Sequence, residues 1–291
     1  MSQTVDQDAA PGTEQNDGPW LSTLIRSLTS QQLSPLGELL PAFPPEELQR
    51  NTTGLSSEAA LRQAHAFYDN VLDAARRAGL VLDRSTRALD FGFGWGRISR
   101  VFMERISLAN IHGLDVDPAF VEITRDLTRS DKFELCAPFP PTKYEDSSFD
   151  IIYLYSVFSH LSEEACQSWM REFARILRPG GVVAFTTRHD SFFDFCEWAK
   201  GQGASSSPYV QALGQLFPDL SQVREAYRAG RFIHASSQGV GGGGPRDESF
   251  YGETWIPEQY ARTGFDDQFE FVSGYFDGTK YDQACFALKR K

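Results

Sequence analysis

The segment Ala88-Leu-Asp-Phe-Gly-Phe-Gly-Trp-Gly-Arg-Ile-Ser-Arg100 decides the fold of this chain. A short apolar run ends in three glycines at alternate positions, and apolar residues at helical spacing follow them. This order is typical of a strand, a tight turn and a helix. Glycine is favoured where a chain turns sharply and where its backbone must lie against a ligand. The segment therefore predicts a nucleotide-binding turn at the end of a strand.

A second predicted strand, near residues 110–114, leads into the acidic stretch Asp115-Val-Asp117. Asp115 follows the glycine turn at close to the roughly 20-residue interval expected for an acid that binds a ribose. The other interpretation makes Asp115 the cap of the next helix. Asp117 fits that role better, because Pro118 follows it at the first helical position. We therefore expect Asp115 to accept hydrogen bonds from ribose hydroxyls, with Val116 beside it.

Three motifs in this order resemble those of the class I S-adenosylmethionine-dependent methyltransferases. The turn at 92–96 resembles their first motif, residues 148–161 their fourth strand and the loop after it, and residues 175–187 their Pro-Gly-Gly turn and fifth strand. The third glycine comes one residue too early for the Gly-x-Gly-x-x-Gly turn of NAD-dependent dehydrogenases. The resemblance covers about 86–188 and, more loosely, 250–290. It implies S-adenosylmethionine as cofactor and S-adenosylhomocysteine as its product.

Alternation of strands and helices predicts an α/β fold with a Rossmann-like, seven-stranded and mostly parallel sheet that has helices on both faces. The predicted strands lie near 87–91, 110–114, 132–136, 149–155, 181–187, 268–276 and 283–289. The predicted helices between them lie near 97–105, 118–129 and 162–177. The resemblance implies that the last two strands form an antiparallel C-terminal hairpin.

The sequence divides into three predicted regions. Residues 1–18 are polar and should be a disordered tail. Residues 19–85 should form a helical N-terminal extension, and 86–291 the methyltransferase domain. Within the extension, helical spacing or capping residues occur at 20–40, 46–54 and 57–79.

A long insertion interrupts the predicted domain at about 190–253. Ordinary connections in α/β units have about 2–6 residues, and a long one at the end of a strand is a common place for a substrate-binding lid. The insertion contains an aromatic helix with Phe192 and Trp198, a helical segment near 208–230 and a glycine loop at 239–244. We expect this loop to become ordered only when the acceptor binds.

Composition narrows the classes of partner. A net charge of −11 and a pI near 5.0 argue against nucleic acid as the main partner. The four cysteines are scattered, so a reduced set without a zinc site is expected. No apolar run approaches the ~18 residues of a membrane span, and the acidic first residues lack the basic-then-apolar pattern of a signal peptide, so none is expected. We expect a soluble, cytoplasmic protein that binds a small molecule, without a membrane or metal partner; its oligomeric state stays open.

The resemblance also implies which residues contact the cofactor. Many family members have an acid after the third strand that binds adenine, but this chain has Cys136-Ala-Pro-Phe139 there. Backbone groups near Ala137 and stacking on Phe139 are expected instead. Arg62 and Tyr68 are weaker candidates for the cofactor carboxylate, because an arginine on such a helix is more often solvated. The predicted cofactor-binding residues are Asp90, Gly92, Phe93, Gly94, Gly96, Asp115, Val116, Ala137, Phe139, Tyr155 and Ser156.

Two histidines follow predicted strand ends and are candidate general bases. We predict His189 first and His160 second, although His160 at the start of a helix is equally well explained by packing or capping. A hydroxyl acceptor needs a base, so O-methylation of a sugar or secondary metabolite is slightly favoured over N-methylation. Predicted acceptor-binding residues are Arg188, which could meet an acidic group, Tyr251 and Trp255. The alternative is a catalytically inert methyltransferase-like domain that binds a partner or the cofactor.

Overall fold

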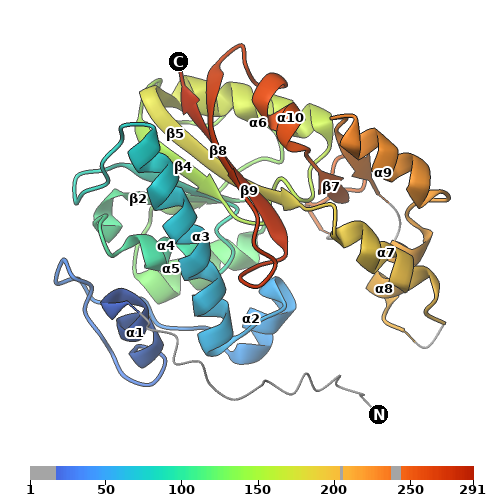
Figure 1. Ribbon diagram of the computed structural model, residues 1–291. Coiled ribbons are helices and arrows are strands. Elements are labelled where there is room, and N and C mark those ends of the chain that lie inside the picture. The colour runs from blue at the N-terminus through green and yellow to red at the C-terminus, as the bar shows by residue number, and fades with distance from the viewer. Residues whose placement is uncertain (1–17, 204–205, 237–243) are drawn as a thin grey trace.

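The computed structural model of the chain describes residues 18–203, 206–236 and 244–291 (Figure 1). The predicted disordered tail, except for residue 18, lies outside the described residues. The same holds for all of the 239–244 loop except Gly244.

Seven strands form the central sheet in the order β3-β2-β1-β4-β5-β9-β8. The first five pair in parallel, and β9 runs antiparallel to both β5 and β8. The predicted mostly parallel sheet with its antiparallel C-terminal hairpin is therefore confirmed. The strands are β1 (Ala88–Phe91), β2 (Ile111–Asp115), β3 (Phe133–Leu135), β4 (Phe149–Leu154), β5 (Leu177–Arg188), β8 (Phe269–Tyr275) and β9 (Gln283–Arg290).

The central strand β1 determines where a ligand can bind. Ala88 pairs with Ile111 of β2 on one side and with Ile151 of β4 on the other. The chain order reverses between these neighbours. In open α/β sheets a crevice forms outside the carboxyl ends of the strands at such a reversal. The glycine turn that follows β1 lies at this point.

Helices cover both faces of the sheet, as predicted (Figure 1). One face is covered by α1 (Pro19–Arg26), α3 (Ser57–Arg77), α4 (Arg97–Phe102) and α5 (Pro118–Thr128), and the other by α6 (Glu163–Ile176) and α10 (Glu258–Thr263). A short 3-10 helix, Leu108–Asn110, precedes β2. Local capping fixes the helix starts: the Asp117 carboxylate accepts from the Ala119 amide, and the Ser162 hydroxyl accepts from the Ala165 amide.

The N-terminal extension packs on the same face as α4. The helical pattern of 20–40 is realised only in α1, and the chain then turns through an isolated bridge between Leu33 and Leu39. Next comes α2 (Glu46–Thr53), and Gly54 ends it in the left-handed conformation. Trp20 donates its indole N–H to the carbonyl of Val101 at 2.8 Å, which joins α1 to α4.

The insertion forms a small unit beyond the end of β5, seen at the right of Figure 1. It has its own apolar cluster around Trp255. The predicted helix near 208–230 is two helices, because Pro218 interrupts it and Asp219 caps the second one. The elements are α7 (Phe192–Lys200), α8 (Pro208–Gln215), α9 (Leu220–Arg228), β6 (Ile233–Ala235) and β7 (Glu253–Trp255), with β6 and β7 paired antiparallel.

Candidate active site

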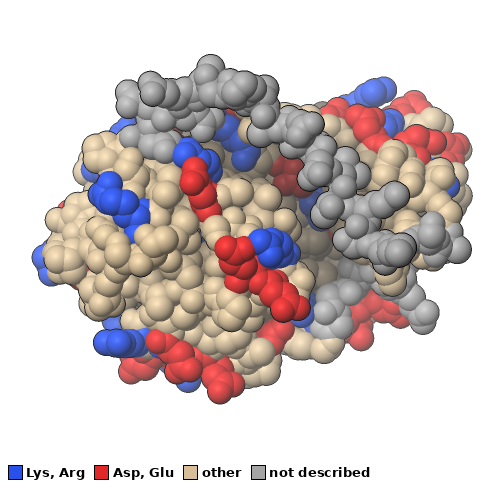
Figure 2. Space-filling view, turned by 90° about the horizontal axis from the view of Figure 1, so that it is seen from below, with Lys and Arg blue, Asp and Glu red and all other residues tan. Residues whose placement is uncertain are grey.

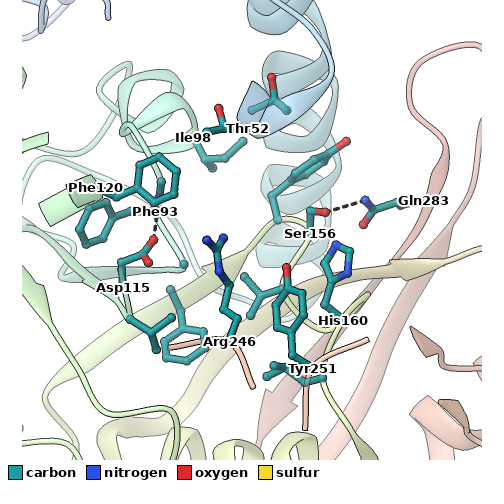
Figure 3. A pocket seen from close by; sticks show the side chains of 18 of the residues that line it. Thr52, Phe93, Ile98, Asp115, Phe120, Ser156, His160, Arg246, Tyr251 and Gln283 are labelled. Atoms are coloured by element: carbon teal, nitrogen blue, oxygen red, sulfur yellow. Dashed lines mark hydrogen bonds between the residues drawn. The ribbon is translucent and has the colours of Figure 1, made fainter. Parts of the chain in front are cut away.

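A cavity of about 920 Å³ lies at the carboxyl ends of the parallel strands. It is enclosed by the glycine turn, the ends of β2, β4 and β5, the last residues of α2 and parts of the insertion. Figure 3 shows Phe93 and Asp115 on one side of this cavity, and Ser156, His160 and Gln283 on the other. We call these the Asp115 side and the His160 side.

The glycine turn forms the floor of the Asp115 side. A Cβ atom built on Gly94 would have no described atom within 4 Å, and its φ of +53° is unfavourable for other residues. Gly92 differs, because its Cβ would lie 2.3 Å from Cγ2 of Val157. Gly96 precedes α4 and faces Thr124. Of the three predicted glycines, Gly94 alone thus leaves open space for a ligand, whereas the other two allow tight packing.

Asp115 is held rigidly at the end of β2. Its Oδ2 accepts from the Gly94 amide at 2.9 Å and its Oδ1 accepts from the Asp117 amide at 3.0 Å. Burial raises the pKa of this carboxyl, and the two amide bonds oppose that rise. Each oxygen keeps a further lone pair, so the carboxylate is oriented but can accept additional bonds.

Asp90 lies beneath the turn, outside the lining of the cavity. It is 1% exposed and accepts from the Ser99 hydroxyl at 2.6 Å, which ties β1 to α4. Burial raises its pKa to about 7. Its position joins the strand before the glycine turn to the helix after it, and its predicted role in organising the turn stays a prediction.

The His160 side contains a buried ion pair. Arg188 donates from Nε to Oε2 of Glu253 at 2.6 Å, and the Tyr209 hydroxyl donates to Oε1 at 2.8 Å. A second carboxylate, Asp282, lies 3.6 Å from Nη1 of Arg188, and the guanidinium stacks 4.0 Å above the Phe192 ring. Arg188 is therefore already paired with a carboxylate, and its predicted contact with an acidic group of the acceptor stays a prediction.

His160 is oriented by the backbone of the insertion. Its Nδ1 lies 2.8 Å from the Gly252 carbonyl, and since a carbonyl only accepts, Nδ1 carries the proton. The ring stacks parallel to Tyr251 at 5.0 Å, and Nδ1 lies 3.8 Å from Oε1 of Glu253. Burial lowers the pKa of His160, so the ring is neutral near pH 7. Its Nε2, with no hydrogen-bond partner among the described residues, is left as a basic nitrogen.

His189 lies outside the lining of the cavity. Its ring stacks on Phe276 at 3.4 Å, and its Nδ1 accepts from the Ser191 amide at 3.3 Å. The turn after β5 directs His189 toward the β8–β9 loop, so of the two candidate bases it is His160 that lines the cavity.

Ser156 links three strands at the centre of the cavity. Its φ of +60° is unusual for a residue other than glycine. Thr186 accepts from the Ser156 amide at 2.7 Å, and Gln283 donates to its hydroxyl at 2.9 Å. Thr186 in turn donates to the Gln283 side-chain carbonyl at 2.6 Å. Since β4, β5 and β9 are joined by these bonds, the strained conformation is held in place.

Comparison with known proteins bears on the chemistry of this cavity. Residues 89–185, from β1 into β5, match the family model described as a methyltransferase domain. A methyltransferase domain therefore occupies residues 89–185 of the chain. In the described part of the chain, no helix has both the length and the apolar character needed to cross a membrane.

Named relatives match part of this chain. Methyltransferase GfsG of Streptomyces halstedii is 33% identical over 103 residues, which cover 34% of this chain and 36% of that protein. A malonyl-[acyl-carrier protein] O-methyltransferase of Enterobacter lignolyticus is 30% identical over 148 residues, covering 50% of this chain and 56% of that protein. The chain thus spans about a third to a half of these relatives. The PH0226 protein of Pyrococcus horikoshii OT3 superposes with a TM-score of 0.48 at 13% identity, over 77% of this chain and 91% of that one.

The residues present fit S-adenosylmethionine, as two features show. Gly94 leaves a space that a Cβ would enter, and the fixed carboxylate of Asp115 borders the same space. Among the predicted cofactor residues, those that line the cavity are Gly92, Phe93, Gly94, Asp115, Val116, Tyr155 and Ser156. Among the predicted catalytic and acceptor residues, those that line it are His160, Arg188 and Tyr251.

The other predicted site residues lie elsewhere. Ala137 and Phe139 are outside the lining, because Phe139 turns to pack on Phe250 at 5.3 Å; Cys136 and Pro138 line the cavity in their place. Trp255, predicted to bind the acceptor, is 0% exposed and stacks on Phe193 at 4.6 Å inside the insertion.

Sequence reasoning missed Arg97, Tyr209, Glu253 and Gln283, all of which line the cavity. Three of them lie in or after the insertion, where no motif indicated their register. Arg97 follows the glycine turn directly, and its adjacency to Gly96 was the one signal that marked it.

Proposed function

We propose that this methyltransferase transfers the methyl group of S-adenosylmethionine to a hydroxyl group of a small, uncharged molecule. The observation that carries the proposal is that one cavity joins Asp115 and Gly94 to the basic Nε2 of His160. When bound, S-adenosylmethionine supplies an electrophilic methyl group on a sulfonium, and S-adenosylhomocysteine remains after transfer. A hydroxyl acceptor also needs a base, which an amine acceptor that binds in its neutral form does not.

His160 is the proposed base. Its Nε2 takes the proton of the acceptor hydroxyl as the hydroxyl oxygen bonds to the methyl carbon. The imidazolium that forms lies near the Glu253 carboxylate, at 3.8 Å, which stabilises it. The Gly252 carbonyl keeps the ring in one tautomer throughout, so the protein does not reorganise during the step.

The charges of the His160 side favour an uncharged acceptor. Arg188 is paired with Glu253 and approached by Asp282, so it has no free charge for an anion. The relatives named as malonyl-[acyl-carrier protein] O-methyltransferases act on an acidic malonyl group, and an acceptor of that kind would find no unpaired arginine on this side. A sugar or another polyhydroxylated metabolite suits the surrounding hydrogen-bonding groups better.

Nucleic acid is a poor candidate for the acceptor. The net charge is −11, and on the face seen in Figure 2 the basic side chains are interspersed with acidic ones. Nucleic-acid recognition generally uses clustered Lys and Arg. This charge distribution supports a small-molecule acceptor.

Turnover of two histidine variants tests the proposal. His160→Asn keeps an amide donor for the Gly252 carbonyl but removes the basic nitrogen, so we expect turnover to fall by ~10²–10⁴. S-adenosylhomocysteine affinity, measured by calorimetry, should be nearly unchanged. Turnover is measured as transfer of labelled methyl into a metabolite extract.

His189→Asn is the matched control, because it removes an imidazole outside the cavity and should keep near wild-type turnover. Full turnover of His160→Asn would exclude the histidine base and favour an amine acceptor. A lack of S-adenosylmethionine binding by the wild type would overturn the proposed function itself.

A further inference from the structure

Three arginines line the cavity, and they differ in how their charge is balanced. Arg188 is paired with Glu253, and Arg246 lies 3.2 Å from Oδ2 of Asp117. Arg97 has no carboxylate within 4.0 Å among the described residues, although it is only 5% exposed. A buried charge without a counterion is costly, so an anion bound beside Arg97 would lower this cost.

The neighbours of Arg97 hold it in place without neutralising it. Its Nη1 donates to the side-chain carbonyl of Gln63 at 2.6 Å and to the Ala60 carbonyl at 3.3 Å. Its guanidinium carbon lies 4.8 Å from the centre of the Tyr155 ring. These partners orient the guanidinium from the α3 side and leave its positive charge available.

Tyr155, next to Arg97, carries a second polar group that lacks a partner among the described residues. It is 8% exposed, and its hydroxyl is buried without a hydrogen-bond partner among the described residues. Burial raises the pKa of this phenol, so it stays a protonated donor. Among the described residues, a guanidinium without a carboxylate within 4.0 Å and a hydroxyl without a hydrogen-bond partner thus adjoin one another in the wall of the cavity.

We propose that Arg97 and Tyr155 form the subsite that binds the carboxylate of the cofactor's amino-acid part. The inference rests on the proposed function. Asp115 orients the ribose at one end of the glycine turn, while Arg97 begins the helix at the other end, so a ligand lying over Gly94 reaches both. Arg62, considered from the sequence, instead pairs with Glu58 at 2.7 Å on the outer part of α3.

Ligand analogues test this subsite in the wild-type protein. 5′-Methylthioadenosine shares the adenine, ribose and thioether with S-adenosylhomocysteine but lacks the amino acid. Decarboxylated S-adenosylmethionine lacks the carboxylate alone. We expect the wild type to bind decarboxylated S-adenosylmethionine about ten- to hundredfold more weakly than S-adenosylmethionine, as loss of a charge-assisted hydrogen bond implies. Equal affinities would overturn the proposal without requiring any variant to fold.

Variants then assign the effect to Arg97. Arg97→Met should weaken S-adenosylhomocysteine binding about ten- to hundredfold and change 5′-methylthioadenosine affinity less than about threefold. The affinity of Arg97→Lys for S-adenosylhomocysteine should lie between those of the wild type and Arg97→Met, because lysine keeps the positive charge but lacks the planar guanidinium. Arg62→Met is the control and should bind both ligands as the wild type does.

Equal weakening of both ligands in Arg97→Met would show that Arg97 shapes the cavity and does not bind a carboxylate. Unchanged binding of both would also reject the subsite. In either case the wild type still binds S-adenosylmethionine, so the failure is distinct from a failure of the proposed function, in which no cofactor binds.

Discussion

At the scale of the residue, Asp90 makes stability depend on pH. Its carboxyl has a pKa of about 7 in the folded chain against an ordinary value of 3.8. Its stabilising contribution to the free energy of unfolding is therefore fully present below about pH 3.8 and is lost as the pH rises to about 7. Asp90→Asn keeps an acceptor for Ser99 and removes the charge. We expect the variant to gain up to about 4 kcal/mol in unfolding free energy relative to wild type between pH 4 and pH 8. Urea denaturation at both pH values measures this, and identical pH dependence in the two proteins would contradict it.

At the scale of the element, Trp255 holds the insertion together. Its ring contacts Phe192, Phe193 and Phe217 and is fully buried. Trp255→Ala should destabilise this cluster by about 3–5 kcal/mol, because it removes a large buried side chain. We expect faster hydrogen exchange across residues 192–228, with S-adenosylhomocysteine affinity nearly unchanged, because the Asp115 side has a separate core. Exchange mass spectrometry and calorimetry provide the two readouts. Unchanged exchange, or a collapse of cofactor binding, would show that the insertion is not an independent unit.

At the scale of the whole molecule, cofactor binding should stabilise the fold by mass action. S-adenosylhomocysteine at a hundred times its Kd contributes about 2.7 kcal/mol, which raises Tm by roughly 4–5 °C for a chain of this size. NAD should give no rise, and Asp115→Ala should lose most of it at the same ligand concentration. Calorimetric melting measures all three. An equal rise with NAD, or a full rise in Asp115→Ala, would contradict the assignment of Asp115 to the ribose.

The fold could be predicted from the sequence to within a few residues for most strands, because each apolar run is short and ends at a clear turn residue. The helix expected from the pattern of 20–40 is too long. Apolar residues continue at helical spacing past Arg26, but the helix ends there and the chain then turns, so that an isolated β-bridge pairs Leu33 with Leu39. The local sequence pattern also singled out Asp115 and Gly94, both of which line the cavity. It did not reveal that Glu253 neutralises Arg188, because that contact spans 65 residues and depends on how the insertion returns to the sheet.

The attachment of His160 to Gly252 has a consequence for evolution and engineering. Gly252 binds both the backbone and the ring of His160. The Gly252 amide donates to the His160 carbonyl at 2.7 Å, and the Gly252 carbonyl accepts from the His160 ring N–H. The insertion therefore divides into an exchangeable part, α7 to α9, and a fixed return segment around Gly252. A chimera that grafts foreign helices onto the ends of β5 and β6 while keeping residues 250–256 should keep His160, the proposed base, in its present position. One that replaces the return segment as well discards it. We therefore expect new acceptor preferences to be reached by exchanging α7 to α9, and not by exchanging the return segment around Gly252.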